Sequence, residues 1–208
     1  MTEFWNELMT QASWEKLQEL SGEFDFILIG GWAAYLWCGM HKSKDIDIIV
    51  NYGTLPKIQE RYPLTKNDRL KKYEVKFQGF DIDIYLPFYS RLALPLEDLM
   101  KSAVKVKGIR TVPLEALLIL KQAAEIDRRN SVKGQKDAID ILTILVYGGI
   151  DLKEYNKMLK RYELTHYIDE LLYVIANVDT RNLKFLDMNV KSFSDWKKKT
   201  SKKLRALR

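Results

Sequence analysis

The chain of 208 residues is long enough for one large domain or two small ones. Apolar residues make up 47% and charged residues 30%, a balance that excludes a disordered or fibrous chain. The longest apolar runs are much shorter than the roughly 20 residues that cross a bilayer, and the first residues lack a signal-peptide pattern, so we expect a cytoplasmic protein. The single cysteine, Cys38, excludes an internal disulfide bond and a multi-cysteine zinc site.

The positive charge is concentrated at the C-terminal end. The whole chain has a net charge of +6, whereas residues 191–208 alone carry eight Lys and Arg against one acid, for a net charge of +7. The remaining 190 residues are therefore almost neutral. A basic end of this kind predicts contact with the phosphates of an RNA, such as a tRNA; the alternative is a solvated terminal helix.

The first half of the chain alternates between helical and strand-like patterns. Apolar spacing predicts a helix over 4–20, a buried strand over 24–29, a glycine turn and a helix over 32–40. Further strands are expected over 45–50, 73–77 and 80–86, the last two joined as a hairpin, and 104–112 is expected to form one more strand or a hairpin. These patterns indicate an α/β (α+β) domain with a mixed sheet and flanking helices.

From Pro113 onward the pattern becomes helical. Pro113 suits the first position of a helix, and apolar spacing predicts helices over 114–129, 135–147, 152–161, 166–178 and 194–207. The sequence therefore predicts an α/β domain over residues 1–112. A helical C-terminal domain over residues 113–208 follows and includes the basic end.

Two of the predicted strands carry pairs of acids. Because side chains alternate along a strand, Asp45 and Asp47 share one face, and the aliphatic residues between them face the core. Asp81 and Asp83 repeat this arrangement on a later strand. Burying an unpaired carboxylate is costly, so such strands need compensation for their charge.

A bound divalent cation is one way to compensate this charge. Three carboxylates from two strands can hold two Mg²⁺ ions about 3.5–4 Å apart, an arrangement that assists displacement at phosphorus. The alternative is a solvated acidic face that pairs with nearby lysines, namely Lys42, Lys44, Lys71 and Lys72.

A glycine pair precedes the first acidic strand. Gly30 and Gly31 follow a buried strand and precede a helix, so backbone amides can approach an anion at the N-terminus of that helix. Gly31 lies 14 residues before Asp45, which is the length of one helix and a short loop. The spacing predicts that glycines and acids meet at the same end of the sheet.

These motifs together resemble the signature of the nucleotidyltransferase fold of the DNA polymerase β superfamily. Within it, the chain looks most like the prokaryotic branch of minimal nucleotidyltransferases and AbiEii-type toxins. The resemblance covers residues 24–86 with motifs and 113–147 more loosely. It implies Mg²⁺-dependent transfer of a nucleoside monophosphate from an NTP to an acceptor hydroxyl on RNA, tRNA or protein, and a toxin with an antitoxin partner. The alternative is a non-catalytic nucleotide-sensing or RNA-binding module with this fold.

The resemblance also implies roles for individual residues. Gly30-Gly31 matches the turn that holds the nucleotide's phosphates, and Asp45 and Asp47 match the paired metal ligands. The third carboxylate, which would complete the metal site and help to activate the attacking hydroxyl, is expected to be Asp83. Asp81 is the alternative, because it lies two residues earlier on the same face.

Two further positions match the resemblance in part. Ser43 stands where the family has a hydroxyl just before the acidic strand, so the resemblance implies that it helps Gly30 and Gly31 to hold the β- and γ-phosphates; His41 replaces the usual arginine. Lys121 stands in the first helix after the sheet, where toxin-like members often have a lysine. It could reach the triphosphate or pair with Asp137 or Asp140, and the sequence leaves both open.

Overall fold

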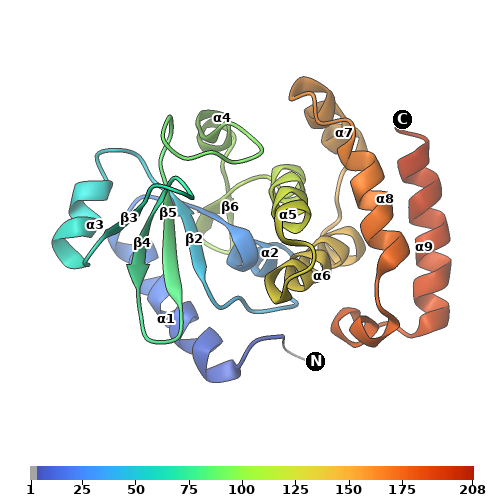
Figure 1. Ribbon diagram of the computed structural model, residues 1–208, viewed down its shortest axis with the longest axis horizontal. Coiled ribbons are helices and arrows are strands. Elements are labelled where there is room, and N and C mark those ends of the chain that lie inside the picture. The colour runs from blue at the N-terminus through green and yellow to red at the C-terminus, as the bar shows by residue number, and fades with distance from the viewer. Residues whose placement is uncertain (1–3) are drawn as a thin grey trace. The chain divides into compact units, whose positions relative to one another are not determined.

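The computed structural model describes residues 4–208 and divides the chain into two compact units (Figure 1). The sheet unit comprises Trp5–Pro113, and the helical unit comprises Leu114–Arg208 together with Phe4. The Phe4 ring packs against Phe185, with the ring centroids 5.5 Å apart. Across the described residues, no helix is long and apolar enough to span a membrane.

A mixed sheet forms the centre of the sheet unit. Within residues 4–208 it has seven strands in the order β3-β4-β5-β2-β1-β7-β6. Strand β2 is antiparallel to β1 but parallel to β5, which follows it much later in the chain. The strands comprise β1 Ile27–Ile29, β2 Ile46–Ile49, β3 Thr65–Asn67, β4 Lys72–Lys76, β5 Asp81–Tyr85, β6 Val104–Val106 and β7 Ile109–Thr111.

Four helices accompany the sheet within the described part of this unit: α1 Glu7–Glu23, α2 Gly30–Cys38, α3 Leu55–Arg61 and α4 Leu96–Lys101. The side chain of Asn6 caps α1 by accepting from the backbone N–H of Leu8. Helices α1 and α2 are joined by a buried hydrogen bond that Trp32 Nε1 donates to Ser13 Oγ at 2.8 Å. The ring of Trp32 is therefore buried while its N–H group keeps a hydrogen-bond acceptor.

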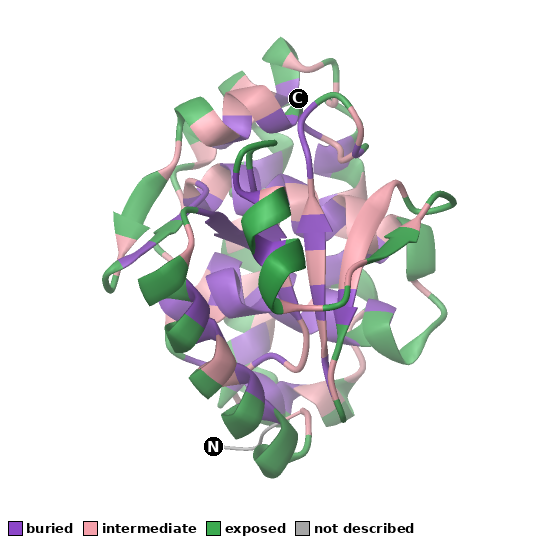
Figure 2. Cartoon of the chain, turned by 90° about the vertical axis from the view of Figure 1, so that its left-hand side faces the viewer, coloured by how far each residue is buried: buried purple, intermediate pink, exposed green. Residues whose placement is uncertain are grey.

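The central strands have one buried face and one partly accessible face. Ile46 and Ile48 of β2 and Ile82 and Ile84 of β5 are buried, whereas the acids between them are of intermediate exposure. In Figure 2 the central strands are mainly buried or intermediate, and many exposed residues lie on helices. The alternation follows from the period of two along a strand, and it presents the acids on the accessible face.

The helical unit consists of five α-helices and one 3₁₀ helix among its described residues: α5 Leu114–Arg128, α6 Val132–Tyr147, α7 Leu152–Arg161, α8 Tyr167–Asn177, η1 Thr180–Leu186 and α9 Val190–Arg205. Side-chain caps start several of them. Asp151 accepts from the backbone of Lys153 and Glu154 at the start of α7, and Ser131 accepts from Gly134 at the start of α6.

Several elements differ from the sequence prediction. Helices α3, α4 and η1 and strand β3 were not predicted, because each is short and shows no long run of apolar spacing. The segment 104–112, which was predicted as one strand or a hairpin, is the hairpin β6–β7, in which Gly108 takes a φ of +90°. The predicted glycine turn is shorter than expected, because α2 begins at Gly30 itself.

Candidate functional site

The sheet register brings acids from three strands into one line. Asp47 of β2 is the direct neighbour of Asp83 on the parallel strand β5. Asp83 in turn is the neighbour of Glu74 on the antiparallel strand β4. Neighbouring residues in register point to the same face of a sheet. We call these three residues the acidic row.

The other two predicted acids lie beside this row. Asp45 stands immediately before β2, and its Oδ1 accepts a hydrogen bond from the backbone N–H of Asp81 at 3.2 Å. Asp81 is the register partner of Lys76 on β4. The backbone of Asp81 therefore orients Asp45, while Asp83 is the acid of β5 that lies next to Asp47.

Because Gly30 has no side chain, there is room beside it for the Asp47 carboxylate. It follows Ile29, the register partner of Asp47, and its φ of +71° lies in the left-handed region. A Cβ atom at position 30 would lie 2.1 Å from Asp47 Oδ2 and 2.9 Å from Asp47 Cβ. Only glycine fits both the φ angle and this close approach. The carboxylate thus lies at the N-terminus of α2, where the helix dipole favours negative charge.

Ser43 supports the start of the acidic strand. It is buried, and its hydroxyl donates to the backbone carbonyl of Asp45 at 3.3 Å. Gly31, the second glycine of the motif, is buried in the first turn of α2. The structure therefore brings Gly30, Ser43 and the acids to the same end of β1 and β2.

Lys72 of β4 holds the outer part of the acidic row. Its Nζ lies 2.6 Å from Asp83 Oδ2 and 2.9 Å from Glu74 Oε1. Glu74 also accepts a hydrogen bond from Asn67 Nδ2 at 3.0 Å. The three charged side chains are only 11–15% exposed, so this ion pair is better shielded than one on the surface.

The pKa shifts reflect this shielding. Burial raises the pKa of the Asp83 carboxyl above its usual range, against the lowering effect of the hydrogen bond from Lys72, and the charges of Glu74 and Asp45 raise it further. Burial alone would lower the pKa of Lys72, but its hydrogen bonds and charge interactions with Asp83 and Glu74 outweigh burial and raise it. The lysine is therefore held in its charged form.

The carboxylates of this face suit a hard cation such as Mg²⁺, although they do not surround one completely. Among the described residues, no three His, Cys, Asp or Glu side chains are grouped closely enough to enclose a metal ion by themselves. Mg²⁺ is usually bound by one or two carboxylates together with waters and the phosphates of a substrate. Asp45 and Asp47 supply two carboxylates of this kind on one face, so the residues fit Mg²⁺ that arrives with a nucleotide.

Lys121 lies in the helical unit and forms ion pairs there. Its Nζ is 3.1 Å from Asp137 Oδ1 and 2.8 Å from Asp140 Oδ2. Lys136 lies 2.5 Å from the other oxygen of Asp140, and Arg128 lies 2.7 Å from Asp137. We call Lys121, Lys136, Asp137 and Asp140 the buried ion cluster. The sequence left open whether Lys121 pairs with Asp137 or Asp140 or reaches a triphosphate. In the structure it pairs with both aspartates.

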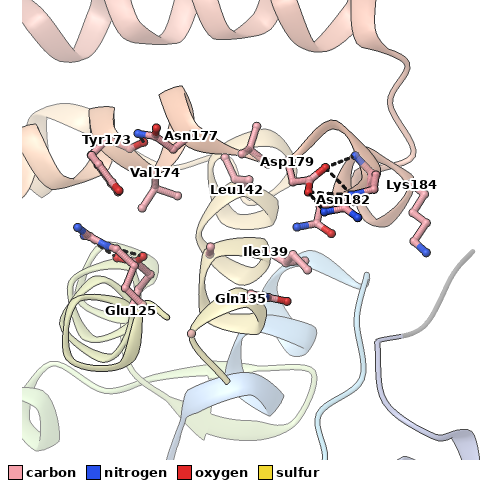
Figure 3. Close-up of a pocket in the computed structure, with 15 residues that line it drawn as sticks. Glu125, Gln135, Ile139, Leu142, Tyr173, Val174, Asn177, Asp179, Asn182 and Lys184 are labelled. Atoms are coloured by element: carbon pink, nitrogen blue, oxygen red, sulfur yellow. Dashed lines mark hydrogen bonds and ion pairs between the residues drawn. The ribbon is translucent and has the colours of Figure 1, made fainter. Parts of the chain in front are cut away.

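A cavity of about 550 Å³ lies within the helical unit, among residues of α5, α6, α8 and η1 (Figure 3). Its wall includes Ile139 and charged groups that pair with one another. Arg129 donates two hydrogen bonds to Glu125, and Arg181 donates to Asp179. All of its lining residues belong to the helical unit, so the cavity contains no residue of the acidic row.

Sequence reasoning named Lys72 only as one of four lysines that could pair with the acidic face, and it did not name Glu74. The signal was present in the alternation of Lys72 and Glu74, which repeats the period of two seen in the acidic strands. However, the expected strand began at residue 73, and the predicted hairpin of 73–77 with 80–86 did not state the register that places Glu74 beside Asp83. Tyr85 was missed for the same reason; its hydroxyl lies 3.5 Å from Asp47 Oδ1.

The chain matches no protein-family model and no curated protein sequence. It is similar in structure to a candidate nucleotidyltransferase from H. pylori, with a TM-score of 0.52, 18% identity and coverage of 98% of this chain and 99% of that chain. JHP933 from Helicobacter pylori has a TM-score of 0.47, 19% identity and coverage of 97% and 98%. An antigenic nucleotidyltransferase-like protein from Paracoccidioides brasiliensis has a TM-score of 0.43, 15% identity and coverage of 78% and 91%.

The likeness to the first of these structures extends over almost the entire length of both chains. At 18% identity it shows a shared fold. The predicted fold class is therefore confirmed: the chain has a nucleotidyltransferase-like fold with a mixed sheet, followed by a helical C-terminal region. The narrower resemblance to AbiEii-type toxins stays a prediction.

Proposed function

We propose that the protein is a Mg²⁺-dependent nucleotidyltransferase, which transfers a nucleoside monophosphate from an NTP to an acceptor hydroxyl. The observation that carries this proposal is the register of Asp47 beside Asp83, with Gly30 at the N-terminus of α2 directly against Asp47. Carboxylates for a cation and a helix N-terminus for phosphates thus occupy adjacent positions. The nucleotidyltransferase-like fold supports the same reaction class.

In the proposed reaction, the acceptor oxygen forms a bond to the α-phosphorus, and the bond from that phosphorus to the bridging oxygen of the β-phosphate breaks. The leaving group is pyrophosphate. The hydroxyl proton passes to the carboxylate of Asp83, which has one oxygen on Lys72. Bound Mg²⁺ would neutralise the negative charge that develops on the phosphates. The protein contributes mainly by positioning and by charge stabilisation.

Each residue of the site has a part in this proposal. Asp45 and Asp47 would bind the metal, and Asp83 would complete the site. Gly30-Gly31 would admit the β- and γ-phosphates at the start of α2. Ser43 holds the backbone of Asp45 through its hydroxyl, so its part is to keep the acidic strand in place.

RNA is the acceptor that the surface favours. Helix α9 buries Phe193 and Leu204 and exposes most of its basic residues, namely Lys191, Lys198, Lys199, Lys202, Lys203 and Arg205. Such a helix offers a row of cations to a phosphate backbone. Modification of a tRNA by this reaction would fit a toxin that is controlled by an antitoxin partner, as the motif resemblance implies.

The first test is transfer of label from each of the four α-³²P-labelled NTPs with Mg²⁺, using total tRNA and the protein itself as acceptors. We expect one labelled acceptor with the native protein and none with Asp45→Ala or Asp47→Ala. Asp68→Ala is the matched control, because Asp68 is an exposed acid of the same unit. Binding of Mg²⁺ and NTP without transfer would instead indicate a nucleotide-sensing module.

The proposed RNA interaction has its own test. Four exposed lysines of α9 (Lys198, Lys199, Lys202 and Lys203) can be replaced by Gln while Phe193 and Leu204 keep the helix packed. We expect RNA affinity to fall. The slope of its logarithm against the logarithm of salt concentration should become shallower by about 1 for each phosphate that a lysine no longer neutralises. An unchanged slope would show that α9 is only a solvated helix.

A further inference from the structure

The side chain of Lys72 is fixed beside the acidic row. Lys72 and Glu74 lie two residues apart on β4, so their side chains share the face of the sheet that carries Asp83. Lys72 Nζ lies 2.6 Å from Asp83 Oδ2 and 2.9 Å from Glu74 Oε1. Asn67 of β3 holds Glu74 from the other side, at 3.0 Å. The ammonium group is therefore held between acids of β4 and β5, one of which is itself held by Asn67 of β3.

This arrangement affects how many metal ions the site can hold. A two-ion site would use Asp83 as the third ligand, as the sequence predicted. Here one oxygen of Asp83 already accepts from Lys72, which is only 11% exposed. A second divalent ion at Asp83 would lie against this ammonium group, and the two positive charges would repel each other.

We propose that Lys72 takes the place of the second metal ion, so that the site binds a single Mg²⁺ at Asp45 and Asp47 together with the NTP. This inference rests on the proposed function, because it assigns a part within that site. Lys72 acts as a positioning residue: it holds Asp83 beside Asp47 and supplies the positive charge that a second ion would otherwise supply.

The decisive measurement is the number of Mn²⁺ ions bound per chain, counted by electron paramagnetic resonance with Mn²⁺ and the non-hydrolysable analogue α,β-methylene ATP. We expect one tightly bound ion in the full-length native protein and none in Asp45→Ala. In Lys72→Met, which leaves Asp83 without its ammonium partner, we expect a second ion. Lys76→Met is the matched control, because Lys76 lies on the same face of β4 but opposite Asp81, and it should keep one ion.

Each possible ion count either supports or overturns the inference. Two ions in the native protein would overturn the inference while leaving the proposed reaction intact. No bound ion in the presence of the analogue would overturn both the inference and the metal-dependent reaction. If Lys72→Met does not fold, Lys72→Arg can be used instead; it keeps the positive charge and should bind one ion. The number of ions bound by the native protein, one or two, still tests the inference without any variant.

Discussion

The acidic row of the sheet unit and the buried ion cluster of the helical unit use similar residues for different purposes. In the cluster two aspartates contact two lysines, all four only 1–7% exposed, and Asp137 also contacts the more exposed Arg128. The row places three acids beside one lysine, on a face of intermediate exposure. Every acid of the cluster has a cation beside it, whereas the row has a net negative charge that a bound cation can neutralise. Charge balance and access, more than residue type, separate a structural set of charges from a candidate active site.

The largest effect should come from breaking the balance of the buried ion cluster. Lys121→Met removes the lysine that contacts both Asp137 and Asp140. Loss of one partner from a buried ion pair typically costs about 3–5 kcal/mol, and we expect the free energy of unfolding in urea to fall by that amount. Lys157→Met, which breaks an exposed pair with Glu154, should change it by less than about 1 kcal/mol.

The same pair of variants tests the alternative role of Lys121. If Lys121→Met is as stable as Lys157→Met but has a raised KM for NTP, then Lys121 contacts the triphosphate, as the resemblance implied. A loss of stability with an unchanged KM in the remaining folded protein would make the cluster structural.

A smaller effect on stability, with a large effect on activity, is expected in the sheet unit. Gly30→Ala places a methyl group against Asp47, whereas Gly39→Ala, at the other end of α2, has the same φ of +71° but meets its nearest atom at 4.0 Å. Both variants should lose about 1–2 kcal/mol of unfolding free energy from backbone strain, and Gly30→Ala should lose more because its methyl group also clashes with Asp47. Nucleotide transfer should fall about 10²–10³-fold only in Gly30→Ala, because only that variant displaces a charged group of the site. Equal activity in the two variants would contradict the placement of Asp47.

The smallest effect is a pH dependence within the buried ion cluster. Burial would raise the pKa of Asp140, but the charges of Lys121 and Lys136 outweigh burial and lower it below its ordinary value of 3.8. A lowered pKa adds stability that is present above pH 3.8 and is lost as the pH falls through the lower, folded-state value. Urea unfolding between about pH 6 and pH 2.5 should therefore show a steeper loss of stability in the native protein than in Asp140→Asn. Equal slopes would mean that Asp140 does not contribute.

The sequence predicted those features that depend on local periodicity. Alternation alone indicated that Asp45 and Asp47 share a face, and helical spacing indicated most helices of the C-terminal half. The short elements α3, α4, β3 and η1 were missed, because three to seven residues carry too little periodicity to stand out. Their formation depends on neighbours that lie far away in the chain.

The sequence by itself determined the chemistry of the site: which residues are acids, which face of its strand each occupies, and that a glycine precedes them. The hairpin of β4 and β5 was predicted from the sequence, but only the tertiary structure decided that β2 lies beside β5 and in which register. Strands β2 and β5 are parallel and in contact, although more than thirty residues separate them, and their register places Asp83 rather than Asp81 beside Asp47. The same register brings Lys72 to Asp83. The physical reason is that side-chain direction follows from local backbone geometry, whereas strand order and register follow from packing of the whole sheet.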